Sequence, residues 1–118
     1  ITGYPVYDRE ILDVTLLESA GNVTLIGDAA HPMSPFKGQG ANQALLDALA
    51  LARSITDTCG TDSKWREIGL RKTLLTNFEK EMINRSTSKV RDSARAVKLL
   101  HSNAVLHEGD EPRMRGLE

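Results

Sequence analysis

The sequence has few of the residues that would point to several common classes of protein. Its single cysteine, Cys59, excludes an internal disulfide framework and a cysteine-based metal cluster. Aromatic residues make up only 4% of the chain, which argues against a stacking platform for single-stranded nucleic acid. The net charge of -1 argues against bulk nucleic-acid binding. No apolar run approaches the roughly 20 residues that are needed to cross a bilayer.

The rest of the composition is typical of a soluble globular protein. Of the 118 residues, 40% are hydrophobic and 26% are charged. This length allows one domain at most, or a piece of one. The chain opens with Ile1-Thr2-Gly3 rather than with Met, and no signal peptide is visible. We therefore expect that the native N-terminus is missing. Because it is missing, the sequence does not determine the compartment, and a cytoplasmic protein is our expectation.

The first part of the chain contains three segments with strand-like patterns. Residues 4–7 and 14–17 are short segments of this kind. Residues 23–26 form an apolar run without alternation, which predicts a parallel strand that is covered on both faces. The run ends at Gly27 and Asp28, so Asp28 is predicted to lie at the carboxyl end of a buried strand.

A loop and three helices are predicted to follow. Two prolines and two glycines exclude a helix from residues 29–40. After this loop, apolar residues recur at three- and four-residue spacing on more than one face, which predicts a largely buried helix that ends at Gly60. Ser63 is the predicted cap of a second helix, and Ser86 or Ser88 is the predicted cap of a third.

The order of chemical groups around the loop predicts a ligand site. Ligands of open α/β sheets bind beyond the carboxyl ends of the strands, where Asp28 could accept a hydrogen bond from a sugar hydroxyl. Gly38 and Gly40 lack Cβ atoms and would let the backbone approach a flat ligand. The following helix begins with N–H groups that have no partners within it and with the positive end of its dipole. This arrangement suits a ligand with a sugar hydroxyl and an electron-rich edge.

Two other nucleotide-binding motifs do not fit this stretch. A P-loop requires Gly-Lys-Ser/Thr, whereas Gly40 is followed by Ala41 and Asn42. The dinucleotide fingerprint requires a third glycine, but Gln43 stands at that position. Its acidic residue also follows the glycines, whereas Asp28 precedes them.

A longer pattern runs through the loop and into the predicted helix. Its residues are Gly27-Asp28-Ala29-Ala30-His31, Pro35, Gly38-Gln39-Gly40-Ala41-Asn42 and Asp47-Ala48. This pattern resembles the GD motif of the flavin-dependent aromatic hydroxylases, the para-hydroxybenzoate hydroxylase-like family of single-component monooxygenases. The resemblance implies FAD as the cofactor, NAD(P)H as the co-substrate and electron donor, and hydroxylation of a small aromatic or polycyclic substrate by oxygen.

The resemblance also implies a role for each part of the motif. Asp28 would accept a hydrogen bond from the ribityl chain or ribose region of FAD. Pro35 would lie beside the reactive centre of the isoalloxazine, and it is the one catalytic residue implied. The backbone N–H groups of residues 40–42 would bind the pyrimidine edge of the flavin. The implied cofactor-binding set is Gly27, Asp28, Pro35, Gly38, Gly40, Ala41 and Asn42.

The implied fold is α/β, with the last strand or strands of a Rossmann-like FAD-binding domain followed by C-terminal helices. Residues 1–20 would end the strands of a substrate domain and return to the FAD domain. Residues 21–107 would form the C-terminal part of the FAD domain, and residues 108–118 a flexible tail. The family's N-terminal Gly-x-Gly-x-x-Gly is absent here. We therefore expect the missing N-terminal part of the same enzyme to be a partner, and this chain alone to bind FAD weakly or not at all and to be inactive.

Two other functions stay open at this point. The first is a related flavoenzyme that does not hydroxylate, such as an FAD-dependent epoxidase or a geranylgeranyl-reductase-like enzyme. The second is a non-catalytic module in which the helices of residues 63–107 bind a partner protein.

The remaining polar residues are expected to be structural. No metal site is predicted, because His31 has no second ligand at a suitable spacing, and we expect it to hydrogen-bond to backbone. Asp47 lies on an apolar helix and is expected to be a buried acid bonded to N–H groups of the preceding loop. The predicted solvent-facing side of the last helix carries Arg91, Arg95 and Lys98.

Overall fold

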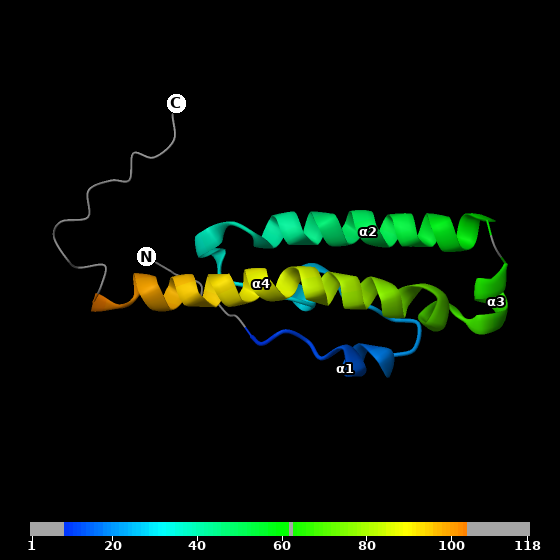
Figure 1. Ribbon diagram of the computed structural model, residues 1–118, viewed down its shortest axis with the longest axis horizontal. Coiled ribbons are helices and arrows are strands. Elements are labelled where there is room, and N and C mark those ends of the chain that lie inside the picture. Colours follow the sequence, from blue (N-terminus) through cyan, green and yellow to red (C-terminus); the bar gives the residue numbers. More distant parts are fainter. Residues whose placement is uncertain (1–8, 62, 104–118) are drawn as a thin grey trace, which may run out of the picture.

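The computed structural model describes residues 9–61 and 63–103, and within them the chain is mostly helical, with no strand. Two long helices lie side by side, and the five short elements and the segments between them connect or flank these two helices (Figure 1). In chain order the elements are α1 (Val14–Glu18), the 3₁₀ turns η1 (Gly27–Ala29) and η2 (Pro35–Lys37), α2 (Gly40–Thr61), α3 (Lys64–Ile68), the π-helical turn η3 (Arg71–Leu75) and α4 (Thr76–Leu100).

The core lies where α4 meets the loop, α2 and the segment around α1. Its buried residues come from the loop and from one face of α4, and they are Ala30, Phe78, Met82 and Ile83. Partly buried side chains pack around them, namely Ile11, Leu12, Val14, Ala50 and Leu51. Because η1 packs against α2 and η2 packs against α4, both long helices contact the loop that carries the motif.

Helix α2 follows the prediction in extent but not in burial. It begins at Gly40 and continues one residue past the predicted stop at Gly60. Its apolar side chains are largely exposed, and Leu45 is 70% exposed. The prediction of a largely buried helix is therefore wrong for this chain. The reason is that α2 packs on only one side, against η1, η3 and α4, among the described residues.

The helices after α2 differ from the predicted pair. Ser63 precedes α3 as predicted, but its side chain makes no capping hydrogen bond. Gly69 ends α3 with a φ of 93°, a left-handed conformation that glycine adopts without steric cost.

The predicted start of a third helix at Ser86 or Ser88 is wrong, because α4 runs through both residues. The hydroxyl of Ser86 donates to the carbonyl of Met82 at 2.8 Å, so it bonds within the helix instead of capping it.

Two of the predicted strands fall on described residues, and neither forms. Residues 14–17 lie in α1, because Asp13 caps this helix by accepting a hydrogen bond from the N–H of Thr15. Residues 23–26 are extended at Ile26 (φ −133°, ψ 165°), but no described segment pairs with them. Val23 is 59% exposed, so the predicted burial on both faces is wrong here. A strand is stabilised only by neighbouring strands and by covering layers, and the described residues supply neither.

Some predictions fall outside the described residues. These are the strand-like segment at residues 4–7 and the tail at residues 108–118. Among the helices that are described, none combines the length and the apolar character that a membrane span requires.

Candidate functional site

The two ends of the motif loop come together in space. The carboxylate of Asp28, in η1, lies next to Gly40, the first residue of α2. A Cβ atom on Gly40 would be 3.6 Å from Oδ1 of Asp28 and 3.7 Å from Cγ of Met33. Asp28, Ala41 and Asn42 are all exposed to solvent. A hydrogen-bond acceptor and the start of a long helix therefore lie side by side on the surface.

The start of α2 supplies donors to the same place. The first turn of an α-helix has N–H groups without partners within the helix, and the helix dipole places partial positive charge there. The first described bond of this helix runs from the N–H of Gln43 to the carbonyl of Gln39, at 3.1 Å. The backbone N–H groups of residues 40–42 precede this bond, at the end of the helix where Gly40 lies next to the Asp28 carboxylate.

Gly27 contacts α2 rather than the open side of the loop. Its φ is +59°, and a Cβ atom on it would lie 3.3 Å from the Cβ of Ala44. Both the left-handed backbone and this close approach favour glycine. Gly38 ends η2 with a φ of +60°, and no atom lies within 4 Å of where its Cβ would be. Gly27 and Gly38 thus have different surroundings, although the resemblance places both in the cofactor-binding set.

A buried carboxylate holds the first half of the loop against α2. Oδ2 of Asp47 accepts a hydrogen bond from the N–H of Gly27 at 2.8 Å, and Nε2 of His31 lies 2.6 Å from the same oxygen. Oδ1 accepts a hydrogen bond from Nη2 of Arg85 at 3.0 Å. We call these four residues the Asp47 cluster. The side chains of His31 and Asp47 are fully buried.

The Asp47 cluster confirms one structural prediction and corrects another. Asp47 is a buried acid bonded to a backbone N–H of the preceding loop, as predicted. His31 is bonded to the Asp47 carboxylate and not to backbone, so that prediction is wrong. An ionised carboxylate can only accept, so Nε2 of His31 is the donor. His31 bonds to Asp47 rather than to backbone because a buried carboxylate is costly unless donors surround it.

Sequence reasoning missed Arg85. It follows Met82 by about one helical turn, so the two residues lie on the same face of α4, and Met82 is fully buried. A charged residue on a buried face needs a partner, and Asp47 was already identified as a buried acid. The pairing of these two side chains was therefore the available signal.

The second half of the loop is held by α4. The hydroxyl of Ser93 donates to the carbonyl of Ser34 at 2.7 Å, and the Ser34 hydroxyl donates in return to the carbonyl of Ser93 at 3.3 Å. Both serines are buried. Pro35, the next residue along the chain, is exposed. The rings of Phe36 and His101 meet edge to face, with centroids 5.8 Å apart.

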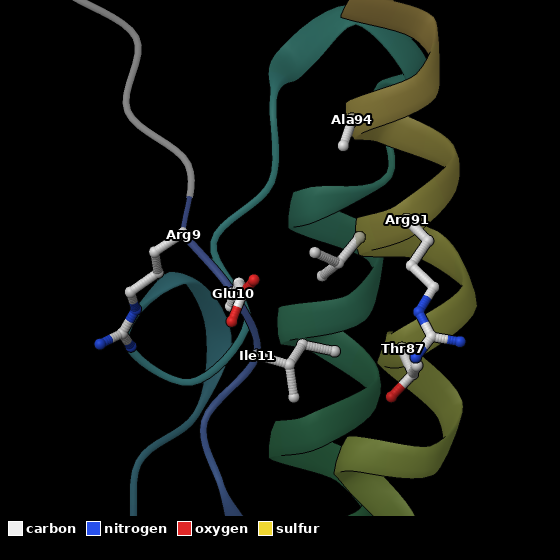
Figure 2. A pocket seen from close by; sticks show the side chains of 7 residues that line it. Arg9, Glu10, Ile11, Thr87, Arg91 and Ala94 are labelled. Atoms are coloured by element: carbon white, nitrogen blue, oxygen red, sulfur yellow. The ribbon is translucent and has the colours of Figure 1, made fainter.

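A separate cavity of about 740 Å³ lies between the segment before α1 and helix α4. Figure 2 shows Ile11 directed towards α4, whereas Arg9 extends away from that helix. The lining residues are Arg9, Glu10, Ile11, Thr87, Val90, Arg91 and Ala94. None of them belongs to the predicted cofactor-binding set, so this cavity is not the predicted site.

The predicted solvent-facing side of the last helix is confirmed, because Arg91, Arg95 and Lys98 are all exposed. Within residues 9–61 and 63–103, no three His, Cys, Asp or Glu side chains are close enough together to hold a metal ion.

Comparison with known proteins identifies the same segment. Residues 17–67 match a family described as the FAD binding domain. The chain is 34% identical to the FAD-dependent monooxygenase thnD of Trichoderma harzianum over 70% of this chain and 24% of that protein. It is 33% identical to 6-methylsalicylate 1-monooxygenase atA of Aspergillus terreus over 81% of this chain and 20% of that protein.

A bacterial relative matches over a shorter stretch. The chain is 49% identical to 3-amino-4-hydroxybenzoate 2-monooxygenase of Streptomyces cremeus over 43% of this chain and 12% of that protein. The chain thus spans about a quarter, or less, of the length of the relatives it matches. No solved structure matches the chain significantly.

These matches confirm the resemblance that the motif predicted. The segment that carries Asp28, the loop and the start of α2 is similar to the FAD binding domain of FAD-dependent monooxygenases. The match bears out the predicted FAD-binding domain family, but the strands of the predicted α/β class are not confirmed, because the described residues contain helices and no strand. Helix α4 lies outside the matched residues.

Proposed function

We propose that this chain forms the flavin-contacting part of an FAD-dependent monooxygenase that hydroxylates a small aromatic or polycyclic substrate. In this proposal Asp28 accepts a hydrogen bond from the ribityl or ribose region of FAD. The backbone N–H groups of Gly40, Ala41 and Asn42 bind the pyrimidine edge of the flavin. Pro35 lies beside the reactive part of the ring, and Gly27 and Gly38 shape the loop between these contacts.

The observation that carries this proposal is the proximity of Asp28 to Gly40. A carboxylate oxygen stands 3.6 Å from the position that a Gly40 Cβ would occupy, at the first residue of a long helix. FAD offers hydroxyl donors on its sugar-like chain and acceptors on its pyrimidine edge, so it needs one acceptor and several donors close together. The helix dipole also favours the negative charge that this edge gains on reduction.

The residues present suit FAD in two further respects. Pro35 is exposed on the loop and its neighbour Ser34 is buried, so the proline is held at the surface by a fixed residue. Gly40 adds no side chain between Asp28 and the N–H groups of α2. When bound, FAD supplies the redox chemistry, and the contribution of these residues is binding, orientation and electrostatic stabilisation.

The electron donor and the substrate are part of the same proposal. The names of two relatives, 6-methylsalicylate 1-monooxygenase and 3-amino-4-hydroxybenzoate 2-monooxygenase, give small aromatic acids as their substrates. By analogy we propose a small aromatic substrate here and NAD(P)H as the donor. Because the chain spans 24% of thnD, we also propose that the remaining contacts to FAD come from a longer form of this protein.

The test is to read the transcript upstream of Ile1, express the longest protein that contains this chain, and measure its flavin content by absorbance. Wild-type protein is expected to hold FAD and to oxidise NAD(P)H with uptake of oxygen. Asp28→Asn, which keeps the size of the side chain but removes its charge, is expected to weaken FAD binding by about tenfold. Asp92→Asn is the matched control, because Asp92 lies on α4 with its side chain 45% exposed.

Three results would contradict the proposal. If the longest expressed protein that contains this chain held no flavin, FAD would not be its cofactor. Equal FAD affinity for Asp28→Asn and Asp92→Asn would remove Asp28 from the site. Absence of labelled oxygen in the product of any substrate that accelerates NAD(P)H oxidation would favour the reductase-like alternative over hydroxylation.

A further inference from the structure

Helix α4 lies outside the residues that match the FAD binding domain, yet it bonds directly to the second half of the motif loop and, through Asp47 of α2, to the first half. We propose that Arg85 and Ser93 are positioning residues for this loop, Arg85 for the turn that carries Asp28 and Ser93 for Pro35. This inference rests on the proposed function, because it concerns the same cofactor site. Neither residue is assigned to contact FAD itself.

Arg85 acts on Asp28 through the Asp47 cluster. Gly27 and His31 lie on either side of Asp28 in the sequence, and both bond to Oδ2 of Asp47, at 2.8 and 2.6 Å. The other oxygen of Asp47 accepts from Arg85 at 3.0 Å. Arg85 therefore sets the rotation of a carboxylate whose second oxygen fixes both ends of the Asp28 turn.

The surroundings make this arrangement sensitive to the loss of Arg85. Asp47 and His31 are fully buried, and the Arg85 side chain is 23% exposed. Removal of the guanidinium would take away the donor to Oδ1 of the buried Asp47 carboxylate, while the donors to Oδ2 remain. The carboxylate would then rotate or admit water, and the Gly27 N–H would lose its fixed acceptor.

Ser93 acts on Pro35 through Ser34. The two serines exchange hydrogen bonds between side chain and backbone, and both are buried away from water. Ser34 immediately precedes η2, which begins at Pro35. The position of Pro35 is therefore set by a pair of hydrogen bonds from α4.

The two contacts act on different parts of the loop. Arg85 and Ser93 are about two turns apart on α4, which corresponds to about 12 Å along the helix axis. Loss of Arg85 is expected to loosen the Asp28 turn and leave η2 in place, and loss of Ser93 is expected to do the reverse. A general loss of packing would affect both.

Amide hydrogen exchange of the full 118-residue chain tests this directly, because the loop contains hydrogen-bonded N–H groups. Those of Ala30 and His31 donate to the Gly27 carbonyl, and that of Gly38 donates to the Pro35 carbonyl, all at 2.9 Å. Arg85→Gln is expected to speed exchange at Gly27, Ala30 and His31 by about tenfold. Ser93→Ala is expected to speed exchange at Gly38 by a similar factor.

Matched controls come from the outward side of the same helix. Arg95→Gln replaces an arginine that is 81% exposed, and Ser88→Ala replaces an exposed serine. Both are expected to leave exchange in the loop unchanged. Ser93→Thr keeps a hydroxyl and Arg85→Lys keeps a charge, so each is expected to restore part of the protection that Ala or Gln removes.

The second measurement uses the longest flavin-holding protein. Arg85→Gln is expected to weaken FAD binding by about tenfold, because the Asp28 turn is no longer pre-organised. Ser93→Ala is expected to change the flavin absorption spectrum and kcat more than the FAD affinity. Ser88→Ala and Arg95→Gln are expected to change neither.

The outcomes separate this inference from the proposed function. The inference would be overturned if the loop amides of the Arg85→Gln and Ser93→Ala proteins exchanged as slowly as those of the wild-type protein. Faster exchange spread evenly over α2 and α4 would also overturn it, since that result indicates general packing. If the longest wild-type protein holds no flavin, the proposed function fails, and the exchange data alone then decide whether α4 orders this loop.

Discussion

Nε2 of His31 lies 2.6 Å from Oδ2 of Asp47, and neither side chain is exposed to solvent. The same oxygen accepts the N–H of Gly27, while Arg85 binds the other oxygen. One carboxylate thus joins α2, the loop and α4. Arrangements of this kind are costly to break, because every remaining partner is left without its acceptor.

Asp47→Asn is expected to lower the free energy of unfolding by about 3 kcal/mol, because one amide cannot replace two carboxylate oxygens. Its NH₂ group would face either Arg85 or the donors from Gly27 and His31. Urea denaturation followed by circular dichroism measures the loss. Asp92→Asn is the control, since its only described ion pair is a 4.0 Å contact with Arg95 on the surface. Equal midpoints for the two variants would contradict this account.

The Asp47 cluster also shows how far the sequence could predict the site. Asp47 was predictable as a buried acid because it stands on an otherwise apolar stretch of helix. The acceptor of His31 was not predictable, because a loop residue can reach many partners and sequence does not give the path of the loop. The proximity of Asp28 and Gly40 was predictable from the order of the groups around the loop, and the resemblance then implied a role for each of them at one cofactor.

The fold was predictable where the signal is local. The extent of α2 follows from helical periodicity after a proline- and glycine-rich loop. The predicted break at Ser86 or Ser88 failed because a serine can bond to a carbonyl one turn earlier as well as cap a helix. The strand at residues 23–26 depends on neighbours that are distant in sequence or absent from the described residues, so no local pattern could guarantee it.

Gly27→Ala is expected to destabilise the protein by about 2 kcal/mol, because a Cβ here combines a left-handed backbone with a close contact. The Cβ would lie 3.3 Å from the Cβ of Ala44. Gly21→Ala separates the two effects, since Gly21 has a φ of +65° and no atom within 4 Å of its Cβ position. The midpoint of thermal unfolding should fall further for Gly27→Ala. A larger fall for Gly21→Ala would show that contact with α2 is unimportant.

Even a conservative replacement of Arg71 is expected to lower the free energy of unfolding. Its guanidinium donates to the buried carboxylate of Glu79 and to the carbonyls of Gly21 and Val23. A lysine keeps the charge but cannot span three acceptors from one position. Arg71→Lys is therefore expected to cost about 2 kcal/mol in unfolding free energy.

Limited proteolysis gives a second measurement for Arg71→Lys. Cleavage within residues 21–26 should become faster, because this extended segment loses two of its hydrogen bonds. Arg53→Lys is the control, since Arg53 is exposed on α2. An unchanged cleavage rate in the Arg71→Lys protein would show that the segment is held by other contacts.

Helix α1 is expected to depend on pH through Asp13. Hydrogen bonds from the backbone N–H and the side chain of Thr15 hold the pKa of Asp13 below its ordinary value of 3.8. A carboxyl with a lowered pKa in the folded state stabilises that state above its unfolded pKa, and the contribution is lost as the pH falls through the folded value. The stabilisation from this cap should thus be full well above pH 3.8 and be lost as the pH falls through the lower pKa of the folded state. An NMR titration should give one midpoint below 3.8 for both the Asp13 carboxyl carbon and the Thr15 amide. Asp13→Asn should cap the helix without this titration, and a wild-type midpoint at or above 3.8 would show that the carboxylate does not cap α1 in solution.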